Sequence, residues 1–218
     1  MNTTCTGGEP EYDENMGDDS GLSHDEQYST ATTVEEFRAN IAEVERRIAA
    51  AAERAGRERT EVELLPVSKT VPQERIRLAV AAGCAKLGEN KVQEAHRKSE
   101  EMADLDINWA VIGHLQSNKA KDVAKFAGEF QALDRLKVAR ALDRRLQAEG
   151  RSLDVYVQVN TSSEDSKFGM PPEELLGFLR ELRSFDSLKV QGLMTLAIFS
   201  SDIDRVRPCF ELLRGLRD

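Results

Sequence analysis

Strand-like and helix-like segments alternate six times along the chain, and this alternation restricts the possible folds more than any other feature. Short apolar runs are each followed by a segment with helical spacing of its apolar residues. Repeated units of this kind pack as a parallel sheet with right-handed crossovers. The predicted strands are 62–68, 85–88, 107–113, 129–133, 153–160 and 189–195, and the predicted helices are 72–82, 91–103, 117–127, 135–149, 171–184 and 202–216. An additional helix precedes them, from a capping box at Thr33 to about Gly56.

A parallel sheet of this kind closes either as an open, doubly wound sheet or as an eightfold barrel. The doubly wound form favours a glycine-rich loop after its first strand, and 68–71 (Ser-Lys-Thr-Val) is not such a loop. We therefore predict an α/β fold of the (β/α)8 TIM-barrel type, with about six of the eight βα units present. Three explanations would account for the two missing βα units. The chain is a fragment or an alternative gene product, it is completed by another copy, or it is a remnant that does not fold stably. Either a monomer or association through open sheet edges is consistent with the missing units.

Lys69 follows the first predicted strand directly, at the turn into a helix that begins near Pro72. In parallel α/β folds, ligands bind at this end of the strands. A lysine beside an apolar strand end is expected to be desolvated, and a neutral amine can attack an aldehyde. The alternative from this stretch alone is a solvated loop lysine.

Polar residues recur where the other predicted strands end, whereas the strand interiors read as apolar. A barrel would bring these residues onto one face. Each also has a plainer interpretation: Asn90 as a helix cap, His114 as a loop residue, and Met194 as a packing residue. The strand-end residues are Asn90, Gly113, His114, Asp134, Asn160, Met194 and Thr195.

Composition limits the functional class. The net charge is −9, and the first 30 residues hold eight acidic residues and no lysine or arginine. We predict a disordered acidic tail over 1–32 and a folded domain over 33–218. The remaining chain has no large basic excess, so nucleic acid is not an expected partner. No secretory signal, membrane span or paired-cysteine motif is visible, which predicts a cytoplasmic protein without a metal site.

Four blocks stand in order: 66–70 (Pro-Val-Ser-Lys-Thr), 88–94 (Gly-Glu-Asn-Lys-Val-Gln-Glu), 112–119 (Ile-Gly-His-Leu-Gln-Ser-Asn-Lys) and 192–195 (Gly-Leu-Met-Thr). Together they resemble the pyridoxal phosphate homeostasis proteins, which are similar to the barrel domain of alanine racemase. The resemblance implies a barrel that holds pyridoxal 5′-phosphate (PLP) as a Schiff base on Lys69, buffers it and passes it on without catalytic turnover, with PLP-dependent apoenzymes as the possible recipients. The cofactor-binding residues it implies are Lys69, Asn90, Gly113, His114, Asn160, Met194 and Thr195, with Lys167 as a secondary candidate.

The chain departs from this family in two places. The segments that hold the cofactor phosphate would lie beyond Asp218, and Ala110 stands where the family commonly has histidine. Two other functions remain open. A PLP-dependent amino-acid racemase would need a second base, typically a tyrosine, and the tyrosines are Tyr12, Tyr28 and Tyr156. A truncated remnant would bind nothing.

Overall fold

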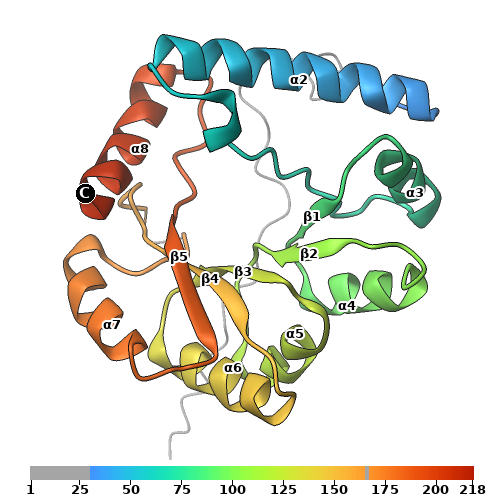
Figure 1. The fold of residues 1–218 in the computed structure, drawn as a ribbon. Helices are drawn as coiled ribbons and strands as arrows, with labels where there is room; N and C mark the ends of the chain where they lie inside the picture. Colours follow the sequence, from blue (N-terminus) through green and yellow to red (C-terminus); the bar gives the residue numbers. More distant parts are fainter. Residues whose placement is uncertain (1–29, 165–166) are drawn as a thin grey trace, which may run out of the picture.

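A computed structural model describes residues 30–164 and 167–218, and its centre is a parallel sheet. The strands run in chain order, β1-β2-β3-β4-β5, and every neighbouring pair is parallel. In a doubly wound sheet the order in which strands are added reverses near the middle, whereas in a barrel each new strand lies beside the previous one. The predicted barrel-type α/β fold is therefore confirmed in its partial form (Figure 1). The strands are β1 (Lys86–Glu89), β2 (Asn108–Val111), β3 (Glu129–Leu133), β4 (Leu153–Gln158) and β5 (Leu188–Met194).

Helices lie on the outside of the curved sheet (Figure 1). The first begins at Thr33, whose hydroxyl accepts the Glu36 amide while the Glu36 carboxylate accepts the Thr33 amide, as the capping box predicts. The helices are α2 (Val34–Arg54), α3 (Gln73–Ala81), α4 (Val92–Glu101), α5 (Ala120–Phe126), α6 (Leu136–Ala148), α7 (Leu175–Leu182) and α8 (Ile203–Arg217). Short 3₁₀ turns are η1 (Arg59–Glu61), η2 (Ser117–Lys119) and η3 (Pro172–Glu174). Of the predicted acidic tail, residues 1–29 lie outside the described residues.

The predicted strand 62–68 is wrong as a strand, although this segment does lie parallel to β1. One bridge joins Val67 to Gly88, through bonds from the Ser68 amide to the Gly88 carbonyl and from the Gly88 amide to the Pro66 carbonyl. The next bond of a parallel ladder would need an N–H on Pro66, and proline has none. Val67 is also 46% exposed, not buried as predicted.

The apolar core lies between the sheet and the helices. Alternate residues of β3 and β4, such as Phe130 and Val155, point outward and pack against apolar residues of α6 such as Leu142. A second cluster holds Trp109 and Ile76 between the sheet and α3. This arrangement follows from the period of two in the strands and 3.6 in the helices.

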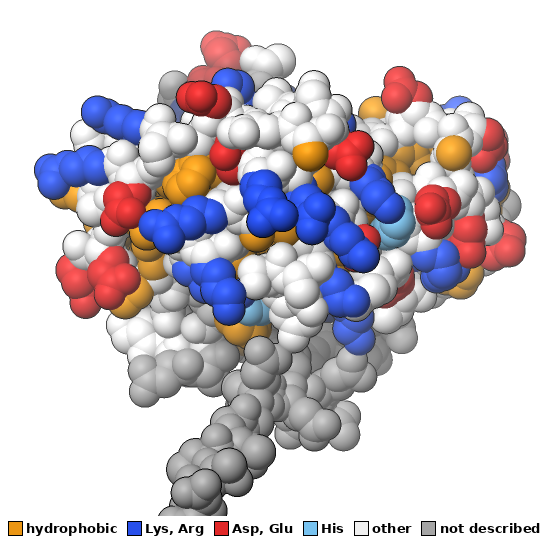
Figure 2. All heavy atoms as spheres, turned by 90° about the horizontal axis from the view of Figure 1, so that it is seen from below, with side chains coloured by type: hydrophobic (Ala, Val, Ile, Leu, Met, Phe, Trp, Pro, Cys, Tyr) orange, Lys and Arg blue, Asp and Glu red, His pale blue; other side chains and the backbone are white. Residues whose placement is uncertain are grey.

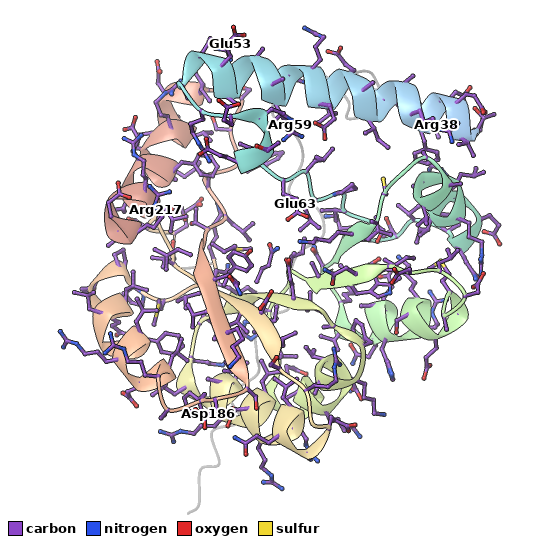
Figure 3. All side chains as sticks on the ribbon, viewed as in Figure 1. Arg38, Glu53, Arg59, Glu63, Asp186 and Arg217 are labelled. Atoms are coloured by element: carbon purple, nitrogen blue, oxygen red, sulfur yellow. The ribbon has the colours of Figure 1, made fainter. Side chains whose placement is uncertain are left out.

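The opposite, concave face of the sheet is polar near the amino ends of the strands, and the expectation of apolar strand interiors is wrong there. Lys86 of β1 pairs with Glu129 of β3 at 2.5 Å and with Glu63 at 2.8 Å. Figure 3 shows Glu63 pointing toward the space that the sheet partly encloses. On β4 and β5, Asp154 accepts a bond from Gln191. Sequence periodicity within one strand does not predict these ion pairs, because the paired charges come from strands far apart in the sequence.

The outer helices carry basic side chains. Figure 2 shows lysine and arginine gathered on the face seen from below. The exposed basic residues of α5 and α6 are Lys121, Lys125, Lys137, Arg140, Arg144 and Arg145. A solvated outer face is the simplest interpretation of such a row. Over the described ranges, no helix combines the length and apolarity that crossing a membrane requires.

Candidate functional site

The four residues 68–71 form a tight turn, the Lys69 turn, at the carboxyl end of the parallel segment beside β1. The Val71 amide donates to the Ser68 carbonyl at 3.1 Å. The Ser68 side chain is buried, and its hydroxyl donates to Oε1 of Glu89, the last residue of β1, at 2.7 Å. Lys69 is the second residue of this turn. It is exposed, and the expected desolvation of its amine by the protein is wrong.

The buried amine of Lys98 supports the Lys69 turn by donating to the Ser68 carbonyl. Lys98 of α4 is 2% exposed, and its Nζ lies 2.6 Å from the Ser68 carbonyl, 2.6 Å from Glu89 Oε1 and 2.8 Å from Glu94 Oε1. Burial works against the charge of Glu94, but bonds from Lys98 and from the Thr70 amide outweigh it and lower the pKa of the Glu94 carboxyl. Sequence reasoning missed Lys98, because a lysine on a helix normally predicts a solvated face.

Asn90 and Gly113 lie just after the neighbouring strands β1 and β2, and their backbones approach very closely. A Cβ built on Gly113 would lie 2.0 Å from the Asn90 carbonyl oxygen. The Asn90 side chain is exposed at this end of the sheet. Glycine at position 113 is therefore explained by backbone contact, whereas its contact with a cofactor stays a prediction.

The variant Gly113→Ala is expected to destabilise the fold by about 1–3 kcal/mol, because the new methyl group meets backbone that cannot rotate away. Chemical unfolding followed by circular dichroism measures this loss. Gly177→Ala in α7 is the matched control, since nothing lies within 4 Å of the place that its new methyl group would occupy. That change should stabilise the protein by about 0.5–1 kcal/mol through helix propensity. Equal effects of the two substitutions would contradict the steric explanation.

His114 lies in a cluster that the sequence showed only in part. Its ring stacks on Phe168 with centroids 3.9 Å apart, and its Nε2 lies 3.0 Å from Arg135. Arg135 also pairs with Asp134 at 2.6 Å and donates to the Leu115 carbonyl. Arg135 lies just after β3, and Phe168 lies in the loop between β4 and η3. In the sequence, Arg135 is one of several basic residues in the predicted helix 135–149. No sequence signal therefore predicted its contacts with His114 and Asp134.

Asn160 and Lys167 organise the loop after β4. The Asn160 side chain donates through Nδ2 to the Glu164 carbonyl at 3.0 Å. Its Oδ1 accepts from the Ser162 backbone amide. Lys167 donates to the Ala197 carbonyl at 2.7 Å and pairs with Glu164. Both side chains are thus occupied in holding the loops after β4 and β5, and a direct cofactor role for either remains a prediction.

Met194 is the last residue of β5, and Thr195 follows it. The Thr195 hydroxyl lies 2.8 Å from the hydroxyl of Thr161 and donates to the Val159 carbonyl. Two hydroxyl groups therefore meet where β4 and β5 end. Thr161 was not among the predicted residues, although its place just after Asn160 is the signal that could have found it.

The predicted residues lie at the carboxyl ends of the strands or, like Lys167, in the loops that follow, but their contacts form separate groups. Asn90 meets Gly113, His114 meets Arg135, and Thr195 meets Thr161. A hollow of 420 Å³ lies elsewhere, at the amino end of β5 near Asp186 (Figure 3), and so is not this site. Among residues 30–164 and 167–218, no group of three or more His, Cys, Asp or Glu is placed to hold a metal ion.

Comparison with known sequences shows which proteins this chain is similar to. Residues 38–214 match the family of the alanine racemase N-terminal domain. The pyridoxal phosphate homeostasis protein of Pseudomonas aeruginosa is 41% identical over 177 residues, which are 81% of this chain and 77% of that protein. Its counterpart in Escherichia coli K12 is 38% identical over 180 residues, covering 81% of this chain and 76% of that protein.

Solved structures agree. An unknown protein from Bifidobacterium adolescentis has a TM-score of 0.78 and 32% identity, covering 84% of this chain and 78% of that one. PipY of Synechococcus elongatus, in a structure with PLP bound, has a TM-score of 0.66 and 34% identity, covering 72% and 73%. The alanine racemase of Streptomyces lavendulae, at 17% identity and a TM-score of 0.63, shares the fold alone; it matches 84% of this chain and 47% of its own. The chain therefore belongs to the pyridoxal phosphate homeostasis protein family, within the wider family of the alanine racemase N-terminal domain.

Proposed function

We propose that this protein binds PLP through the Lys69 amine and acts as a carrier in intracellular PLP homeostasis, without catalytic turnover. One observation carries the proposal: Lys69 is presented at the carboxyl end of a parallel sheet, on a turn braced by buried hydrogen bonds. The relative of known structure that has PLP bound shares this fold at 34% identity, which supports the same ligand here.

The residues present fit an aldehyde cofactor. A primary amine that is exposed at the strand ends can attack the aldehyde carbon, forming a C=N bond as water leaves. PLP, when bound, supplies an electron-withdrawing ring. Exposure of Lys69 also suits a carrier, because the bond must be reopened by water or by the amine of a recipient apoenzyme. Asn90, Gly113, His114, Asn160, Met194 and Thr195 complete the proposed binding set, and Lys167 stays secondary.

A racemase is the less favoured function. It would need a base on the other side of the cofactor, and among the described residues the tyrosine available is Tyr156, within β4. Burial raises the pKa of the Tyr156 phenol, and the nearby Glu129 carboxylate raises it further. A phenol that holds its proton this firmly is poorly suited to remove one from a substrate near neutral pH. We infer a non-enzymatic role on these grounds, and we keep the cytoplasmic location that the sequence predicts.

Covalent labelling of the wild-type protein tests the proposal. The protein is incubated with PLP, reduced with borohydride and digested, and the modified peptide is located by mass spectrometry. The expected product is one stoichiometric label on the peptide that contains Lys69, together with a visible absorption band before reduction. Labels scattered over surface lysines, or none, would refute the proposal. Release of α-protons from amino acids would instead support the racemase.

A further inference from the structure

The backbone on both sides of Lys69 is tied to helix α4. Ahead of Lys69, the Ser68 amide donates to Gly88, its hydroxyl donates to Glu89, and its carbonyl accepts from Lys98. Behind Lys69, the Thr70 amide donates to Glu94 Oε1 at 3.0 Å. A residue that only needed to be exposed would not require its neighbours to be held in this way.

Thr70 adopts a strained conformation. Its φ is +60°, in the left-handed region, where a β-branched residue is a rare outlier. It stands at the third position of the 68–71 turn, where positive φ normally selects glycine. Such strain persists when surrounding contacts over-determine the conformation, and it concentrates at functional sites. The Glu94 carboxylate makes the contact that holds the Thr70 amide in place.

Lys98 links the two halves of this support. Its three N–H donors are matched by three acceptors, the Ser68 carbonyl, Glu89 and Glu94. Glu89 is fully buried, and its Oε2 has no hydrogen-bond partner among the described residues. Lys98 and Glu89 are buried and do not form part of the surface around Lys69. The hydrogen bonds of this network instead fix the backbone geometry of the 68–71 turn.

We propose that Glu94 and Lys98 are positioning residues, which hold the Lys69 turn in its strained form and so aim the Lys69 amine at the strand ends. This inference rests on the proposed function for its consequence, because the aim of the amine matters only if Lys69 binds the cofactor. Its structural part, the hold on Thr70, is separately measurable. Neither residue touches the amine itself in the described contacts.

Glu94→Ala tests the proposal through two readouts. Loss of a charged acceptor should speed hydrogen exchange of the Thr70 amide by about tenfold or more in the protein without cofactor. It should also weaken PLP labelling of Lys69 by about tenfold. Adding Thr70→Gly to Glu94→Ala should restore much of the labelling, because glycine adopts positive φ without strain. A merely structural role would not predict this rescue.

Arg97→Ala is the matched control on α4, since Arg97 pairs with Glu101 at the surface and does not contact the turn. It should leave exchange and labelling unchanged. Unaltered Thr70 exchange and labelling in Glu94→Ala would overturn the inference while leaving the proposed function intact. Absence of labelling in the wild type would remove the proposed function, and the exchange data would still decide whether Glu94 holds the turn. If Glu94→Ala does not fold, Glu94→Gln replaces it. Its side-chain oxygen can still accept from the Thr70 amide, so exchange protection and labelling should change together, and retained protection with lost labelling would contradict the positioning role.

Discussion

Lys69→Ala is expected to abolish specific labelling by PLP and borohydride, with the visible absorption band lost as well. The amine is the group that condenses with the aldehyde, and no other lysine is placed on the 68–71 turn. Lys69→Arg should be equally inactive in labelling, because a guanidinium keeps the charge but is a poor nucleophile. The measurement is stoichiometry of label per chain by intact-protein mass spectrometry.

Lys167→Met is the informative comparison for this prediction. Lys167 is the secondary candidate, but its amine already contacts the Ala197 carbonyl and Glu164. Its replacement should leave the label on Lys69. A label that moves to Lys167 in Lys69→Ala, at wild-type stoichiometry, would show that the two lysines exchange roles and that the assignment to Lys69 alone is wrong.

Lys98→Met is expected to cost about 3–5 kcal/mol of unfolding free energy, because it leaves the fully buried Glu89 carboxylate without a counter-charge. The Ser68 carbonyl loses a donor at the same time. The single tryptophan, Trp109, is 4% exposed and packs in the cluster behind α3, so its fluorescence reports unfolding in urea. The expected result is a large fall in the unfolding midpoint.

Two variants separate the buried charge from general loss of packing. Lys98→Met combined with Glu89→Leu removes both charges and should recover much of the stability lost in the single variant. Arg97→Met breaks an exposed pair on the same helix and should change stability by about 0.5 kcal/mol or less. If Lys98→Met is as mild as Arg97→Met, the network beneath Lys69 does not stabilise the fold.

Most elements were predictable because their signals are local. The period-two and helical patterns placed β3 and α6 within a residue or two of their observed bounds, and Thr33 marked the start of α2. The segment 62–68 was predicted wrongly because its apolar composition resembles that of a strand. Its missing ladder bond depends on which residue of β1 stands opposite Pro66, and that register is not visible in one segment.

The candidate site divides in the same way. Its location at the strand ends, and Lys69 within it, follow from element order, since successive parallel strands end on one side. The partners of these residues do not follow. Lys98 is 30 positions from Ser68, and Phe168 is far from His114 in the chain.

The chain alone therefore specifies a succession of strands and helices and a lysine at the first turn, because backbone preference and apolar periodicity act over a few residues. Packing decides the rest. Whether Lys98 is a solvated helix lysine or the buried centre of the Lys69 turn depends on the rotation of α4 against β1, and the same packing sets Lys86 against Glu129 across the sheet. Those are contacts between distant segments, and their energy exists only once the sheet has formed.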